Sequence, residues 1–89
     1  MNPSLEIVWA RIRAHAGEPF RQIRGGEFRY EAPSGYIALD RTNQNIPKSD
    51  FNRALEIVPL ENTAAVQHLR GPSYIYAILM DPRIRQSDW

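Results

Sequence analysis

The chain has 89 residues, of which 43% are hydrophobic, and its formal net charge is +1. This length predicts one domain with a modest core, and the near-neutral charge predicts no strong attraction to nucleic acid or membranes. No stretch is apolar for the roughly 18 residues that a membrane span needs, and no signal peptide is evident. The chain has no cysteine, which excludes disulfides and cysteine–zinc sites and is typical of the reducing cytoplasm. We therefore expect a cytoplasmic protein with no membrane contact.

The first predicted element is a helix that begins at Asn2-Pro3 and ends at Gly17. Asparagine is a good helix cap, proline fits the first helical position, and glycine often follows the last turn. Apolar residues recur at helical spacing on one face, at Leu5, Val8, Trp9, Ile12 and Ala16. Trp9 lies on this face, so we expect it to be a core anchor.

Residues Phe20–Asp40 are predicted to form a three-stranded antiparallel meander with one buried face. Its strands are Phe20–Arg24, Glu27–Ala32 and Tyr36–Asp40. Gly25-Gly26 and Pro33-Ser34-Gly35 are typical of the turns between them. The middle strand alternates, which places Phe28, Tyr30 and Ala32 on the inner face and Glu27, Arg29 and Glu31 on the outer face.

The next predicted element is an amphipathic helix that covers the apolar face of this sheet. Its inner side carries Phe51, Ala54, Leu55 and Val58. Ser49 is the expected N-cap, and Asp50 suits the positive end of the helix dipole. Pro59 is expected to end the helix.

The C-terminal part predicts one or two further short helices. Glu61-Asn62-Thr63 is a plausible cap for a helix through Leu69, with Gly71 after it. The segment Tyr74–Met80 is ambiguous, because its β-branched and aromatic residues favour a buried strand whereas Ser73 and Asp81-Pro82 favour a helix. We predict a helix, and either form would belong to the core or to an oligomer interface.

The predicted order is thus α-β-β-β-α, an α+β domain with helices packed on a three-stranded antiparallel sheet. Over roughly residues 3–58 this order resembles the topology of double-stranded-RNA-binding domains. Its β-β-β-α part resembles the unit of AP2-like and integrase arm-binding DNA-recognition domains. The lysine cluster that the first family carries at the start of its second helix is represented here by Lys48 alone, with Arg53 one turn on.

No residues show the spacing of a known catalytic or metal site. The histidines, His15 and His68, are far apart, and the carboxylates are spread along the chain. Gly-rich phosphate loops and the Gly-x-Ser-x-Gly and His-Glu-x-x-His motifs are missing. We therefore expect a non-catalytic protein without a metal or cofactor.

The polar segment Arg41–Lys48 is the best candidate for a binding surface. It delivers cations and amides to the start of the second helix, where free backbone N–H groups favour anions. Ten of the eleven basic residues are arginine, which suits bidentate recognition of phosphate. The candidate residues for nucleic-acid or anion binding are Arg24, Arg29, Arg41, Thr42, Asn43, Lys48 and Ser49. The competing structural interpretation is a solvated loop, arginine-rich through codon usage. Glu27 and Glu31 flank Arg29 on the same face, which is typical of cross-strand Glu–Arg pairs that stabilise a solvated sheet.

Three kinds of binding remain open on the sequence. The first is a small module that contacts nucleic acid through an arginine-bearing sheet face and the polar loop. The alternative is a protein-interaction or self-associating module, in which surplus aromatic residues and Tyr74–Met80 form an interface with a second copy. A small-molecule pocket lined by Trp9, Phe28, Tyr30 and Tyr76 is the third, but no polar residue specifies its ligand.

Overall fold

The computed structural model describes residues 4–89, which form a small α+β domain with a two-stranded and a three-stranded antiparallel sheet. The predicted fold class is therefore confirmed, while the predicted helix start at Asn2-Pro3 lies outside the described residues. The elements follow in the order α1 (Leu5–Ala14), β1 (Phe20–Arg21), β2 (Glu27–Phe28), β3 (Tyr30–Glu31), β4 (Tyr36–Leu39), β5 (Asn45–Pro47), α2 (Lys48–Leu55), the 3-10 helix η1 (Thr63–Val66), α3 (Pro72–Leu79) and α4 (Pro82–Arg85).

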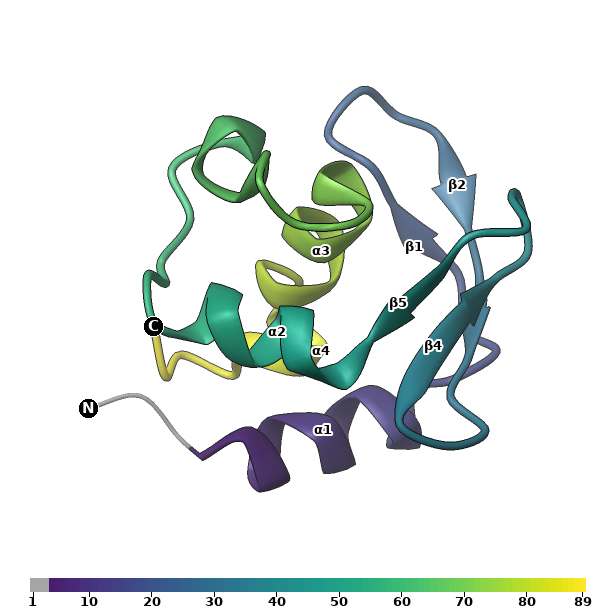
Figure 1. The fold of residues 1–89 in the computed structure, drawn as a ribbon, viewed down its shortest axis with the longest axis horizontal. Coiled ribbons are helices and arrows are strands. Elements are labelled where there is room, and N and C mark those ends of the chain that lie inside the picture. The colour runs from purple at the N-terminus through teal and green to yellow at the C-terminus, as the bar shows by residue number, and fades with distance from the viewer. Residues whose placement is uncertain (1–3) are drawn as a thin grey trace.

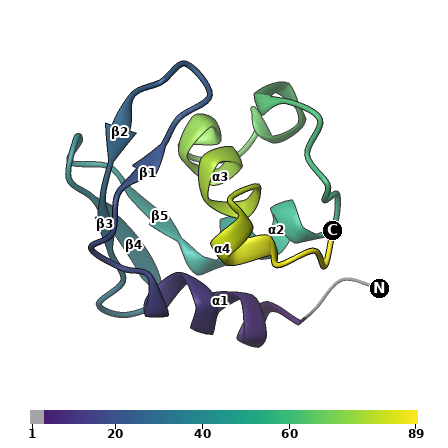
Figure 2. The same cartoon turned by 180° about the vertical axis from the view of Figure 1, so that it is seen from behind.

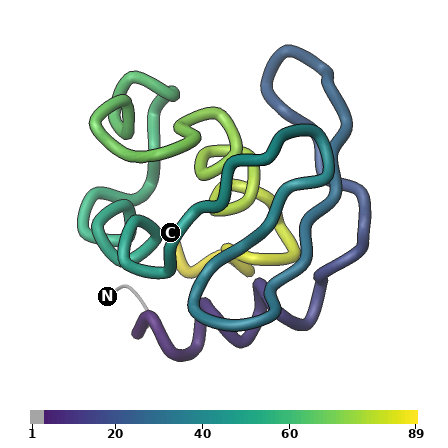
Figure 3. The backbone as a smooth tube through the Cα atoms, turned by 45° about the vertical axis from the view of Figure 1, so that its right-hand side comes forward, coloured from purple at the N-terminus to yellow at the C-terminus, as the bar shows by residue number. Residues whose placement is uncertain are grey.

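Helices and strands occupy different halves of the molecule. α2, α3 and α4 gather on one side, the strands lie on the other, and α1 runs along the base (Figure 1). The view from behind shows the same division (Figure 2). The β1–β2 hairpin extends beyond the other strands, and its turn stands at the top of the backbone trace (Figure 3). This hairpin is thus accessible on the outside of the domain.

The strand pairing differs from the predicted meander. β1 pairs only with β2, with Phe20 opposite Phe28, whereas β3 pairs with β4, with Tyr30 opposite Leu39. The predicted middle strand is therefore interrupted at Arg29, whose backbone N–H donates to the Asp40 side chain at 2.9 Å. Its two halves belong to different sheets because they take different partners.

The third strand of the larger sheet lies inside the segment that was predicted to be a polar loop. β5 pairs with β4 and places Ile46 opposite Ile37, and both side chains are fully buried. A three-residue strand puts a single side chain on its inner face, so alternation is too short to reveal it.

The aromatic residues of the strands form the core, as the alternation predicts. Phe28 and Tyr30 are each about 1% exposed, and Ala32 is half-buried against the core. The ring of Phe28 packs edge-on against Tyr74 of α3, with 4.9 Å between centroids. The ring of Phe20 packs at a tilt of 45° against that of Tyr30, with 5.2 Å between centroids. A helix of the C-terminal part, which the sequence left ambiguous, therefore covers this face of the sheet.

α2 buries the face predicted for it but begins and ends earlier than predicted. Its N-cap is Pro47 rather than Ser49, and no side chain caps it. The backbone N–H of Lys48 donates to the carbonyl of Gly35 at 2.9 Å, so β5 continues directly into the helix. Val58 lies beyond the helix end at Leu55 and is half-buried against the core.

The segment Tyr74–Met80 is helical, as predicted, and forms most of α3. Gly71 is its N-cap and Pro72 takes the first helical position, so the predicted Ser73 cap is wrong. The apolar side chains of this helix that are buried in the domain are Ile75, Ala77, Ile78 and Leu79. Within residues 4–89, no helix combines the length and the apolar character that a membrane crossing requires.

The short elements around α3 use side-chain caps. Asn62 accepts a hydrogen bond from the backbone N–H of Ala64 at 2.9 Å, which confirms its predicted role, although η1 ends at Val66 rather than Leu69.

The C-terminal Trp89 packs against the core, and its indole N–H donates to the carbonyl of Leu79 at 2.8 Å.

Candidate functional site

The turn of the β1–β2 hairpin is tight and is fixed to the rest of the domain. Gly25 has a φ of +94°, which favours glycine, and its N–H donates to the carbonyl of Gln22 at 2.8 Å. The side chain of Gln22 donates to Ser73 Oγ, at the start of α3, at 2.9 Å. Because of this contact, the turn has a defined position relative to the helices.

Three arginines gather around this turn, and we call Arg21, Arg24 and Arg41 the arginine cluster. Arg21 Nη1 donates to the carbonyl of Gly25 at 3.1 Å, and Arg41 Nη1 donates to that of Glu27 at 3.4 Å. Arg24 is exposed in the turn itself. Carbonyl oxygens orient the two bound guanidinium groups without cancelling their charge, so the cluster remains positive.

Arg41 reaches the hairpin because Gly26 has no side chain. A Cβ on Gly26 would lie 2.7 Å from Arg41 Nη1 and 2.8 Å from Gln22 Oε1, closer than such atoms approach. The sequence predicted Gly25-Gly26 as a turn signal only. The structure adds that the second glycine gives space to a cation from a distant loop.

Thr42 and Asn43 follow Arg41 in the β4–β5 connection. Thr42 Oγ1 accepts a hydrogen bond from the backbone N–H of Gln44 at 3.2 Å, and Asn43 is exposed. The threonine therefore shapes the turn, which agrees with the structural interpretation of this loop. Asn43 stays a candidate because it lies beside the cluster along the chain.

Lys48 and Ser49 lie at the opposite end of the β4–β5 pair from Arg41. Tyr36 pairs with Pro47 at one end of this ladder, and Ala38 pairs with Asn45 at the other. The seven candidate residues therefore do not form one surface. The structure brings Arg24 and Arg41 together around the β1–β2 turn and places Lys48 and Ser49 elsewhere.

Arg29 is exposed on the outer face of the strands, as predicted. Its guanidinium donates to the carbonyl of Gly17 at 2.9 Å. Among residues 4–89, neither Glu27 nor Glu31 forms an ion pair with Arg29 or with any other arginine. The predicted cross-strand pairing of these charges is therefore not observed.

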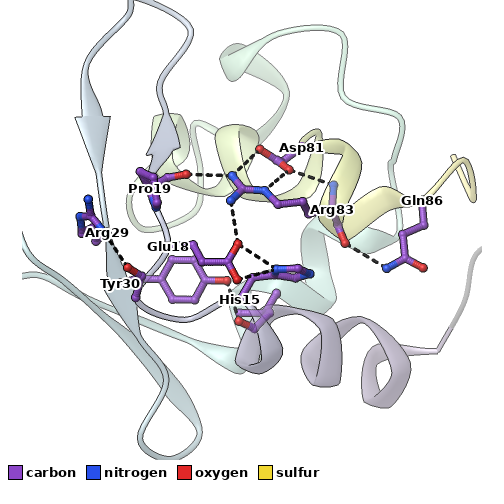
Figure 4. A network of polar contacts seen from close by, with 10 residues as sticks. His15, Glu18, Pro19, Arg29, Tyr30, Asp81, Arg83 and Gln86 are labelled. Atoms are coloured by element: carbon purple, nitrogen blue, oxygen red, sulfur yellow. Dashed lines mark hydrogen bonds and ion pairs between the residues drawn. The ribbon is translucent and has the colours of Figure 1, made fainter.

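A second polar network, which sequence spacing did not predict, joins α4 to the segment after α1 (Figure 4). Arg83 donates to both carboxylate oxygens of Asp81 at 2.9 Å, to Glu18 Oε1 at 3.1 Å and to the carbonyl of Pro19 at 2.9 Å. Its guanidinium also lies 3.8 Å from the ring centre of Phe20. Because Glu18 and Arg83 are 65 positions apart, only the tertiary fold could bring them together.

Hydrogen bonds lower the pKa of both carboxyl groups in this network. The side chain of His15 lies 3.0 Å from Glu18 Oε2, and this hydrogen bond is the main reason that the pKa of Glu18 lies below its usual value. Burial alone would raise the pKa of Asp81, but the hydrogen bonds from Arg83 outweigh it and lower that pKa. The carboxylates of Glu18 and Asp81 and the guanidinium of Arg83 are all paired within the protein, so the network holds α4 against the segment after α1. We call this network the clasp.

The buried hydroxyl of Tyr30 supports a stability prediction. Burial raises the pKa of its hydroxyl well above the usual value of about 10, and the hydroxyl donates to the carbonyl of Ile12 at 2.6 Å. The unfolded chain ionises first, so stability is complete below about pH 10 and falls above it by up to about 1.4 kcal/mol per pH unit. Tyr30→Phe should flatten this alkaline loss and cost about 1 kcal/mol at neutral pH.

Urea unfolding from neutral to alkaline pH measures both effects. Tyr36→Phe is the matched control, because Tyr36 is half-buried and its hydroxyl has no hydrogen bond within the described chain. An alkaline loss that is the same in both variants would contradict the assignment to Tyr30.

Comparisons with protein-family models, curated proteins and solved structures gave no match. Across residues 4–89, no three histidine, cysteine or carboxylate side chains gather as they would around a metal ion. The geometry of the arginine cluster is therefore the main guide to function.

Proposed function

We propose that this protein is a non-catalytic binding module that contacts the phosphates of double-stranded nucleic acid through the arginine cluster. The observation that carries the proposal is that Arg21, Arg24 and Arg41 lie around the β1–β2 turn. This turn extends beyond the other strands (Figure 3). Arginine binds phosphate in a bidentate manner, and an oriented guanidinium loses less conformational freedom on binding. Two of these groups are oriented by carbonyl oxygens, which favours an anionic partner.

The burial of the aromatic residues supports a duplex over a single strand. Proteins that bind single strands stack unpaired bases on exposed aromatic rings. Within residues 4–89 every aromatic side chain is buried or half-buried, which leaves little ring surface on which a base could stack. A duplex presents its phosphates without requiring such a platform.

The tip of the hairpin adds a second feature that suits a duplex. Ile23 is 61% exposed and lies directly beside Arg24 in the turn. Apolar side chains flanked by arginine are typical of segments that enter the minor groove. The hairpin tip would thus reach the groove while the arginines contact the adjacent phosphates.

Salt dependence tests the proposal directly. Three phosphate contacts predict that the logarithm of the binding constant falls against the logarithm of salt concentration with a slope of about −3. Arg24→Ala and Arg41→Ala should each reduce this slope by about 1. Fluorescence anisotropy with random duplex and single-stranded oligonucleotides over a salt series measures the slopes.

Two further variants separate position from charge. Arg53→Ala removes an exposed arginine of α2 that has no side-chain partner in the described chain, so binding should change little. Gly26→Ala keeps every charge but displaces Arg41, so it should weaken binding. Absence of duplex binding at low salt, or equal loss in all arginine variants, would contradict the proposal.

Self-association is the second candidate function, and the fold supports it less. The predicted interface, Tyr74–Met80, contributes its buried apolar side chains to the core of a single copy. Only Tyr74, Tyr76 and Met80 remain half-buried there. An interface with a second copy through this segment therefore stays a prediction, which sedimentation over a range of concentrations can test.

A further inference from the structure

A groove separate from the arginine cluster runs between α1 and the connection from β3 to β4. Its lining includes Glu6, Trp9, Arg13, Ser34, Gly35 and Lys48. It lies at the Lys48 end of the β4–β5 pair, whereas Arg41 follows the other end of β4. The groove is thus a distinct location with its own cations.

Trp9 contributes a hydrogen-bond donor that the protein itself does not use. The residue is 5% exposed, and buried indole N–H groups normally find an acceptor. Its ring contacts Phe51 and Lys48, but its N–H has no hydrogen bond within the described chain. No buried side-chain nitrogen or oxygen of that part of the chain lacks a partner, so this N–H must reach solvent. Since Trp9 lines the groove, we infer that its N–H opens there.

Two cations line the same groove as Trp9. Lys48 Nζ lies 5.8 Å from the ring centre of Trp9 and 3.4 Å from Glu6 Oε1. The side chain of Glu6 is 80% exposed, so its pairing with Lys48 is weak and easily exchanged. Arg13 is exposed, and its guanidinium has no hydrogen bond or ion pair in the described chain. The groove therefore holds more donors and positive charge than the protein uses.

We propose that this groove binds a small oxyanion, a carboxylate or a phosphate, through Trp9, Lys48 and Arg13. The Trp9 N–H donates one hydrogen bond, and the two cations supply charge and further donors. Lys48 turns from Glu6 to the incoming anion, and the Glu6 carboxylate, which is 80% exposed, is then solvated by water. The site goes beyond the proposed nucleic-acid contact, and it is independent of the arginine cluster.

The two tryptophans make a matched pair for testing this site. The indole N–H of Trp89 already donates to Leu79, whereas that of Trp9 has no acceptor among residues 4–89. In nitrogen-15 NMR spectra at constant ionic strength, inorganic phosphate or acetate should shift the Trp9 signal to saturation and leave the Trp89 signal in place. The ion that saturates at the lower concentration identifies the preferred oxyanion.

Variants then test whether the charge of Arg13 contributes to binding of the anion. Arg13→Ala should weaken binding of that ion about tenfold, as expected for a lost hydrogen bond to a charged group. Arg53→Ala removes the same charge elsewhere and should leave the affinity unchanged. A Trp9 signal that does not move with either ion, or one that moves without saturating together with that of Trp89, would overturn the proposal.

Discussion

Replacing Gly71 by alanine should lower the free energy of unfolding by about 3 kcal/mol, since strain and overpacking add at this position. Gly71 has a φ of +63°, in the left-handed region that disfavours a side chain. A Cβ there would also lie 2.7 Å from Cδ1 of Ile46, which is fully buried in β5. The methyl group would thus separate the start of α3 from the three-stranded sheet.

Two other glycines separate these causes. Gly25 has a φ of +94° but nothing within 4 Å of its added Cβ, so Gly25→Ala should show the strain alone, about 1–2 kcal/mol. Gly35 has neither feature, and Gly35→Ala should change stability by less than about 0.5 kcal/mol. Urea unfolding of the three variants gives the comparison, and equal stabilities for Gly71→Ala and Gly35→Ala would refute this account.

Arg83→Met should lower the free energy of unfolding by about 2–3 kcal/mol, because it leaves a partly buried carboxylate without its main partner. Asp81 loses both side-chain hydrogen bonds from Arg83, and Phe20 loses the guanidinium at 3.8 Å. Methionine keeps much of the apolar stem, so the change reports chiefly on charge and hydrogen bonding. Arg53→Met is the control, since that exposed side chain has no partner within the described chain.

The same variant should change the response to acid. The pKa of Asp81 is lowered in the folded protein, so its stabilising contribution is present above the unfolded pKa near 4 and is lost as pH falls through the folded pKa. In Arg83→Met the backbone N–H of residue 83 still donates to Asp81, but the side-chain hydrogen bonds are gone, so the pKa should be lowered less and the acid loss from this group should be smaller. Thermal unfolding from neutral to acidic pH tests this. A wild-type acid profile in Arg83→Met would show that the clasp contributes little.

Sequence periodicity was sufficient for the first two helices, each of which buries one face. The spacing of Val8, Trp9 and Ile12 predicted α1, and that of Phe51, Ala54 and Leu55 predicted the buried face of α2. These features are local, because apolar side chains repeat with the period of the element that buries them. The composition of α3 allowed a helix or a strand. In the structure this segment is a helix, with Gly71 as its N-cap and Pro72 at its first position.

The candidate site could be predicted only in part. Arg24 and Arg41 were candidates on residue type, but their convergence depends on Arg41 reaching past Gly26. Lys48 was predicted to share a surface with Arg41 because the two are close in sequence. The β4–β5 pairing instead places Lys48 at the opposite end of this strand pair. No signal in the sequence pointed to the clasp between Glu18 and Arg83.

The amino-acid order by itself determined the fold class, the inward positions of Phe28 and Tyr30, and the apolar faces of the first two helices. Tertiary structure alone decided which strands pair, that Asn45–Pro47 joins a sheet, and which charged groups meet. The physical reason is the separation along the sequence of the residues that must interact. Burial of a periodic face is specified within a few residues, whereas hydrogen-bond partners in a sheet and ion pairs are chosen among groups that meet only when the chain has folded.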